Sequence, residues 1–187
     1  MVKAEWGGQA NFASFSSQAR GVAILFKKDL PVHIYEDCIY NDPSGNFTAL
    51  NFSYESYTIT LGCIYGPNQD EPEFYKNVVF PKLEEFEEKS DFTVIGGDWN
   101  VALNKEMDTF GYSSVNNEKA KSTINEFVET NGLNDIFREL NPSSKRYTWR
   151  QYGGKRGLGW TIFLFRVHYY HLLRHLTLYQ GFCLTIL

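Results

Sequence analysis

The sequence predicts an α/β sandwich in which two β-sheets pack face to face and helices flank them. Three observations support this fold class. Alternating, β-prone segments fill the first third of the chain, amphipathic helical segments follow, and the two kinds do not alternate strictly as in a βαβ fold. With 187 residues, of which 43% are hydrophobic and 17% aromatic, the chain has the material for one domain with a substantial core.

Strand patterns dominate residues 20–65. Two strands are expected first, and a turn rich in Asp, Pro, Gly and Asn then leads into a hairpin closed by Glu55-Ser56. The four strands are Arg20–Phe26, Val32–Tyr40, Phe47–Tyr54 and Tyr57–Tyr65. In the last of them every second residue is apolar or aromatic, which predicts a strand that is buried on one face.

A helix is expected over Glu71–Lys89. Tyr75, Val79, Leu83 and Phe86 fall on one stripe, opposite a run of glutamates. Pro81 lies inside this segment and should kink or split the helix, because proline lacks the N–H group that a helix interior needs.

Phe92–Ile95 is the next expected strand, followed by a second helix over Glu118–Thr130. In this helix Ile124, Phe127 and Val128 should face inward. Asn131-Gly132 should end the helix, since glycine readily adopts the left-handed conformation of a helix C-terminus.

Polar residues follow three of the β-prone segments. Gly96-Gly97-Asp98-Trp99-Asn100 follows Phe92–Ile95, and Tyr65-Gly66-Pro67-Asn68 ends the strand before it. A third short segment, Arg146–Arg150, carries Thr148, Trp149 and Arg150. An aspartate can move a proton or bind a cation, and an asparagine can donate hydrogen bonds to a phosphate oxygen. We therefore expect these segment ends to contribute to one polar site, although Gly-Gly-Asp is also ordinary turn chemistry.

The ordered set of motifs resembles the endonuclease/exonuclease/phosphatase superfamily. Within it, the sequence is most similar to the apurinic-type endonuclease domain of LINE-type (non-LTR) retrotransposon polyproteins. The motifs are Gly-Val-Ala-Ile-Leu at 21–25, Tyr-Gly-Pro-Asn at 65–68, Val-Ile-Gly-Gly-Asp-Trp-Asn at 94–100 and Tyr-Thr-Trp-Arg at 147–150. The similarity extends from about Glu5 to Arg156.

This resemblance implies Mg²⁺-dependent hydrolysis of DNA phosphodiesters. It assigns to Tyr65 the phenol that hydrogen-bonds the phosphate, to Asp98 the carboxylate that moves a proton, and to Asn100 the amide that binds the phosphate and orients Asp98. Substrate-strand contacts fall on Asn68, Thr148, Trp149 and Arg150. The simpler alternatives are that Tyr65 is a strand-end aromatic, Asn100 a turn former, Trp149 a packing residue and the cations at 145–150 a solvated cluster.

Other motifs implied by the resemblance are absent. Family members open with strands that carry an Asn and a metal-binding Glu, and close with Ser-Asp-His; this sequence contains none of these. No residue is therefore assigned to a metal. We expect the fold to be truncated at both ends, Mg²⁺ binding to be weakened and catalysis to be impaired.

Charge divides the chain into two parts. Residues 1–139 hold all 22 acidic residues and 11 Lys and Arg, whereas residues 140–187 hold seven cations and no acid. We expect a partial superfamily domain over 1–156 and a divergent basic, apolar tail over 157–187. Our hypothesis is that this tail is out of frame or read-through sequence that has no role in the sandwich.

A transmembrane tail is not expected, because Arg166, Arg174 and three histidines interrupt its apolar run. No signal peptide is recognisable, so we expect an intracellular protein, nuclear if the family activity is retained. Cys38 and Cys63 should be small core residues. Two alternative functions remain open: a non-catalytic relic whose tail associates with membranes or chaperones, and a phosphatase of the same superfamily that acts on a lipid head group.

Overall fold

The structure is a computed structural model that describes residues 6–16, 21–111, 117–145, 147, 149–150, 157–158, 164–167 and 182–186. Thr148, one of the predicted substrate contacts, lies outside these residues. For Trp149 and Arg150 the structure describes the backbone alone.

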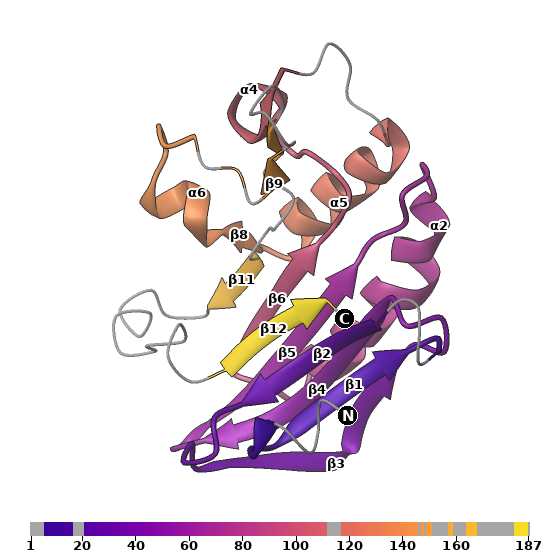
Figure 1. The fold of residues 1–187 in the computed structure, drawn as a ribbon. Coiled ribbons are helices and arrows are strands. Elements are labelled where there is room, and N and C mark those ends of the chain that lie inside the picture. Colours follow the sequence, from indigo (N-terminus) through magenta and orange to yellow (C-terminus); the bar gives the residue numbers. More distant parts are fainter. Residues whose placement is uncertain are drawn as a thin grey trace.

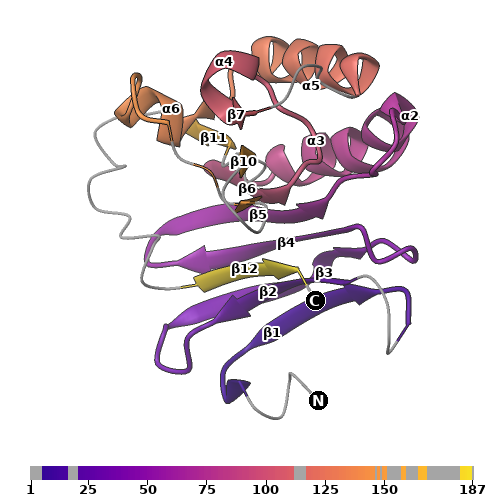
Figure 2. The same cartoon turned by 45° about the horizontal axis from the view of Figure 1, so that its top comes forward.

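Two β-sheets pack face to face, as the sequence predicts (Figures 1 and 2). The small sheet has the order β1-β2-β12, with β1 at Ala10–Ser14, β2 at Gly21–Phe26 and β12 at Phe182–Ile186. The large sheet has the order β3-β4-β5-β6-β11-β8. Its strands are β3 (Val32–Asn41), β4 (Phe47–Tyr54), β5 (Tyr57–Tyr65), β6 (Phe92–Asp98), β11 (Leu164–Val167) and β8 (Asn134–Asp135). A third small sheet has the order β7-β10-β9, at Thr109–Phe110, Gly157–Leu158 and Trp149–Arg150.

Strands β3, β4 and β5 form an antiparallel meander, and β6 then lies parallel to β5. The crossover between β5 and β6 is helical, as parallel neighbours require. The parallel register pairs Ile59 with Phe92 at one end and Tyr65 with Asp98 at the other. The carboxyl ends of both strands therefore lie side by side, which places the two predicted site motifs next to each other.

Each face of the large sheet covers its own hydrophobic cluster. Between the sheets, Val22, Ile24 and Phe26 of β2 pack against Leu50, Phe52, Ile59, Leu61, Cys63, Phe92 and Val94. On the other face, helical side chains pack on Phe47, Ala49, Ile64 and Ile95. Strand β5 is consequently buried on both faces, so the prediction of burial on one face is wrong. The alternation of apolar and polar residues suggested that one face of the strand is exposed. In the structure Thr60, on that face, is buried and hydrogen-bonded to Asn51 and Ser90.

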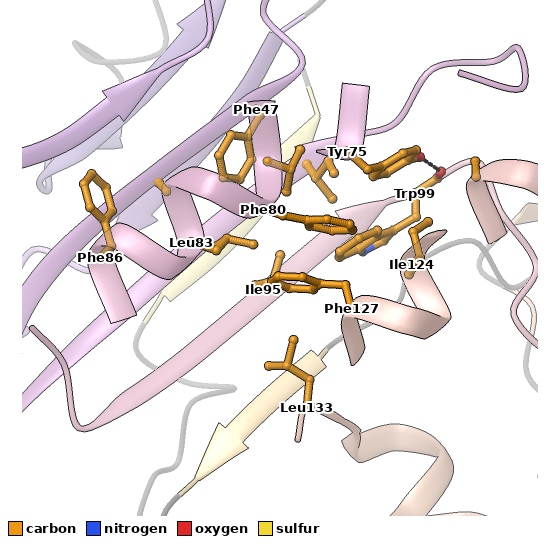
Figure 3. Close-up of a cluster of buried hydrophobic side chains, with 14 of the residues drawn as sticks. Phe47, Tyr75, Phe80, Leu83, Phe86, Ile95, Trp99, Ile124, Phe127 and Leu133 are labelled. Carbon is orange, nitrogen blue, oxygen red and sulfur yellow. Dashed lines mark hydrogen bonds between the residues drawn. The ribbon is translucent and has the colours of Figure 1, made fainter. Parts of the chain in front are cut away.

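The helical crossover is one segment in three parts: α2 (Pro72–Phe74), η1 (Tyr75–Val79) and α3 (Phe80–Glu87). The predicted stripe of Tyr75, Val79, Leu83 and Phe86 is buried, as Figure 3 shows for three of these residues. Pro81 does not split the helix. A π-helical turn precedes it, in which Phe80 donates its N–H to the Tyr75 carbonyl. Because a π-turn widens the helix, the proline ring is accommodated.

The second predicted helix is α5, at Glu118–Thr130, with Ile124 and Phe127 buried and Val128 partly buried. Gly132 ends it with φ +61°, as predicted. Two short helices complete the fold: α4 (Lys105–Asp108) and α6 (Ile136–Leu140). Cys38 and Cys63 are buried in the core, as expected.

Two segments of the tail belong to the sheets. β12 pairs with β2 from Val22 to Phe26, and β11 pairs with both β6 and β8. The expectation that residues 160–187 have no role in the sandwich is therefore wrong for these segments. Both are apolar and rich in β-formers, so they can pair with strands that would otherwise present an unpaired edge. The domain boundary at residue 157 stays a prediction.

Candidate active site

Tyr65 and Asp98 end the two parallel strands and are register partners. Side chains two residues apart in a strand share a face. Tyr65 therefore points to the same side as Leu61 and Cys63, which is the face that packs on the small sheet. The structure thus places the two residues on adjacent strands, at the carboxyl ends of β5 and β6.

The backbone at this point requires glycine. Gly97 has φ +137°, and a Cβ there would lie 2.0 Å from the Ile64 carbonyl oxygen. A Cβ on Gly66 would lie 2.3 Å from the Trp99 carbonyl oxygen. The sequence predicted Gly96 and Gly97 in a loop after the strand. The structure instead places both glycines within β6. The glycines allow two parallel strands and their exit loops to approach closely.

Asn100 joins both loops. Its backbone N–H donates a hydrogen bond to Oδ1 of Asp98 at 2.9 Å, and its carboxamide donates to the Gly66 carbonyl at 2.6 Å. The residue is buried and has φ +52°, a conformation that asparagine tolerates better than most residues. The structure therefore brings Tyr65, Asp98 and Asn100 together, with Asn100 holding Asp98 through its backbone.

Burial raises the pKa of Asp98, although the hydrogen bond from the Asn100 amide opposes the shift. Asp98 therefore keeps its proton to a higher pH than an exposed aspartate does. Such a carboxyl group can hold and release a proton nearer to neutral pH, which suits acid–base chemistry.

Two residues that the sequence analysis missed hold the site loops. Asn117, buried with φ +66°, donates to the carbonyls of Asn100 at 2.9 Å and Asn68 at 3.5 Å. Asp70 accepts hydrogen bonds from the backbone amides of Lys119 and Ala120 and so caps α5 from another loop. An Asn directly before a predicted helix was the available signal for Asn117. Asp70 gave none, because it caps a helix about 50 residues away.

Tyr75, expected only in the buried stripe of its helix, also supports the site: its hydroxyl donates to the Trp99 carbonyl at 2.6 Å (Figure 3). The two rings are stacked with centroids 6.0 Å apart, and both residues are fully buried. Burial, followed by the charges of Asp98, Asp70 and Glu71, raises the pKa of Tyr75. Nε1 of Trp99 has no hydrogen-bond partner among the described residues. The tryptophan of the Asp98 motif thus anchors the site to the helical side of the core.

The described residues do not fit a bound Mg²⁺ ion. Mg²⁺ takes oxygen ligands, usually one or two carboxylates with its waters. Within the described ranges, no group of three or more His, Cys, Asp or Glu is placed to hold a metal. Asp98 is the one predicted site carboxylate, and both oxygens of Asp70, in the loop after β5, already bind the amides of α5.

The fold is the endonuclease/exonuclease/phosphatase fold that the sequence predicts, and it is similar to that of several solved structures. The 3'-5' exonuclease NExo from Neisseria meningitidis is similar with a TM-score of 0.60 and 22% identity, over 84% of this chain and 66% of that one. The AP endonuclease LMAP from Leishmania major is similar with a TM-score of 0.62 and 16% identity, over 83% of this chain and 61% of that one. The endonuclease domain of TRAS1, a telomere-specific non-LTR retrotransposon, is similar with a TM-score of 0.54 and 18% identity, over 89% of this chain and 68% of that one.

These similarities confirm the predicted fold. No family model matches the sequence. The chain spans less than two thirds of the length of the Neisseria and Leishmania chains. In the part of the chain that the structure describes, no helix is long and apolar enough to cross a membrane.

Proposed function

We propose that the carboxyl ends of β5 and β6 form a site for one phosphodiester of DNA, in a protein of the retrotransposon-endonuclease type. The observation that carries the proposal is the register pair of Tyr65 and Asp98, which brings a tyrosine and a partly buried aspartate to adjacent strand ends. The similar structures support DNA as the substrate class. One is the Neisseria 3' phosphatase bound to a product DNA hairpin, and another is a TDP2 complexed with a single-strand DNA product.

In this proposal the Tyr65 phenol donates a hydrogen bond to a phosphate oxygen. Asp98 holds the proton that passes to or from the reacting oxygens, and the Asn100 amide fixes the orientation of Asp98. Asn68, Thr148, Trp149 and Arg150 contact the substrate strand. A bound Mg²⁺ would supply Lewis-acid stabilisation of the phosphate charge, but no step is assigned to it because the described residues do not fit the ion.

Binding of a labelled DNA duplex, measured by fluorescence anisotropy, tests the site. Asp98→Asn removes a negative charge beside the bound phosphate, so we expect about two- to tenfold tighter binding at low salt. Tyr65→Phe removes a donor and should weaken binding about fivefold. Asp91→Asn is the matched control, because Asp91 lies at the other end of β6 and bonds the backbone amide of Thr58. Equal effects of the two Asp→Asn changes would exclude a phosphate at Asp98.

Nicking of supercoiled plasmid in the presence of Mg²⁺ tests the chemistry. We expect nicking by this chain at background level, since acid–base and metal contributions act as a unit and are lost together. A clear Mg²⁺-dependent rate that Asp98→Ala abolishes would show that the residues present suffice for hydrolysis.

A further inference from the structure

A pocket of about 410 Å³ opens beside Tyr65, at the carboxyl end of β5. Asn46, in the turn between β3 and β4, contributes to one wall. The loop that follows β5 forms the other wall with Asn68 and Gln69. The volume is within the range of small-molecule sites. Asp98 does not line this pocket, which therefore extends the site beyond the proposed phosphodiester position.

Unused hydrogen-bonding groups line the pocket. The carboxamides of Asn68 and Gln69 are exposed and make no hydrogen bond to the described residues, whereas Asn46 uses one N–H to bind the Tyr65 carbonyl at 2.6 Å. The Glu71 carboxylate is also exposed, and although Glu71 directly precedes α2 it makes no capping bond. Each carboxamide can donate and accept, but the carboxylate can only accept.

The charge of the pocket excludes a second phosphate. Glu71 is negative, and none of the described residues that line the pocket is Lys or Arg. The aromatic rings of Tyr65 and Phe74 also line it, and such rings can pack against a flat ligand. A planar, uncharged group with a polar edge is the ligand that matches these walls.

We propose that this pocket binds an adenine or cytosine base of a DNA strand whose backbone passes Tyr65. The exocyclic amino group of either base donates to Glu71, and the carboxamides pair with the remaining polar edge. Thymine presents a carbonyl oxygen at the corresponding position, which the carboxylate repels. The inference rests on the proposed function, because it requires a DNA strand at the site.

The test uses labelled single-stranded oligonucleotides of a single base, since their base edges are accessible. Wild-type protein should bind oligo-dA and oligo-dC at least about fivefold more tightly than oligo-dT, as one good base contact implies. Glu71→Gln should bring this ratio close to one, because an amide accepts from an amino group and also donates to a carbonyl.

Glu73→Gln is the matched control. It removes the same charge two residues further along α2, where Glu73 bonds Asn77 and does not line the pocket. Both variants should bind every oligonucleotide somewhat more tightly, and Glu73→Gln should keep the base preference. Glu71→Gln should leave the fold unchanged, since the side chain is exposed and forms no helix cap. An unchanged melting temperature would verify this.

Equal affinity of the wild type for the three oligonucleotides, or equal base ratios in the two variants, would overturn the pocket assignment. A third outcome separates the two proposals. If Asp98→Asn changes the binding of duplex DNA but single strands are bound without base preference, only this inference is overturned. Absence of binding to any DNA would overturn the proposed function together with it.

Discussion

Replacing Asn117 with Asp should loosen both site loops at once. The Asn117 carboxamide donates to the carbonyls of Asn100 and Asn68, which belong to different loops. Aspartate has nearly the same shape and also tolerates a positive φ, so the backbone at +66° is not the variable. The substitution replaces the NH₂ donor of the side chain with a carboxylate oxygen, an acceptor that faces the two carbonyl oxygens.

The magnitude follows from the geometry of the two bonds. The bond to Asn100 is 2.9 Å long and buried, so loss of its donor leaves a buried carbonyl unsatisfied at a cost of about 1–3 kcal/mol. The bond to Asn68, at 3.5 Å, is at the limit of hydrogen-bond geometry and contributes little. We therefore expect a loss of about 2 kcal/mol in the free energy of unfolding at neutral pH.

Urea unfolding measures this loss, and hydrogen exchange locates it. The Gly66 amide, which donates to the Asp98 carbonyl at 2.6 Å, should exchange faster in the variant. Asn131→Asp is the control: it makes the same chemical change at the other end of α5, where the Asn131 side chain bonds Phe127 of its own helix. If the Gly66 amide exchanges equally fast in the two variants, Asn117 does not tie the loops and the reasoning fails.

Three further predictions concern the same region and the sheet edges. Tyr75→Phe removes the hydroxyl that binds the buried Trp99 carbonyl and should lower the free energy of unfolding by about 1–3 kcal/mol in urea titrations. Because burial raises the pKa of Asp98, the folded state binds this proton more tightly than the unfolded state. Ionised Asp98 therefore lowers the free energy of unfolding as the pH rises from the ordinary aspartate pKa through the raised pKa of the folded state. Over that range the melting temperature of Asp98→Asn should increase relative to that of the wild type. Truncation after Gly159 removes β11 and β12, so the shortened chain should lose a cooperative melt; an equally sharp transition would refute their role.

Local patterns predicted most elements of the fold well. The hairpin at 47–65 has a strict alternation and a short turn, and α5 has an apolar stripe with a glycine stop; the structure has both within the predicted bounds. Tyr65 ends its strand as predicted, whereas Asp98 was expected after a strand that ended at Ile95 and instead ends β6 itself. The parallel register that makes them neighbours is a long-range property that the sequence did not specify.

Most of the incorrect or missed features depend on contacts between distant segments, and one is local. The pairing of β12 with β2 joins residues about 160 positions apart, and no local signal predicts such a partner. The π-turn before Pro81 is a local solution that propensity alone does not reveal. Gly97 was expected in a loop because Gly-Gly-Asp is common in turns, yet the close approach of the Ile64 carbonyl makes glycine necessary within the strand.

Several unfavourable features of this structure gather at the carboxyl ends of β5 and β6. Asn100 and Asn117 have positive φ, Asp98 is a partly buried carboxyl group, and the indole N–H of Trp99 lacks a partner among the described residues. Backbone strain of this kind persists only where the surrounding packing determines the conformation. Here that packing is the stacked Tyr75 and Trp99 below the loops, together with the asparagine hydrogen bonds between them. The loops are therefore held in place before any ligand binds. It follows that a substrate strand would meet a preformed carboxyl group and a preformed pocket, and that its binding energy need not be used to order them.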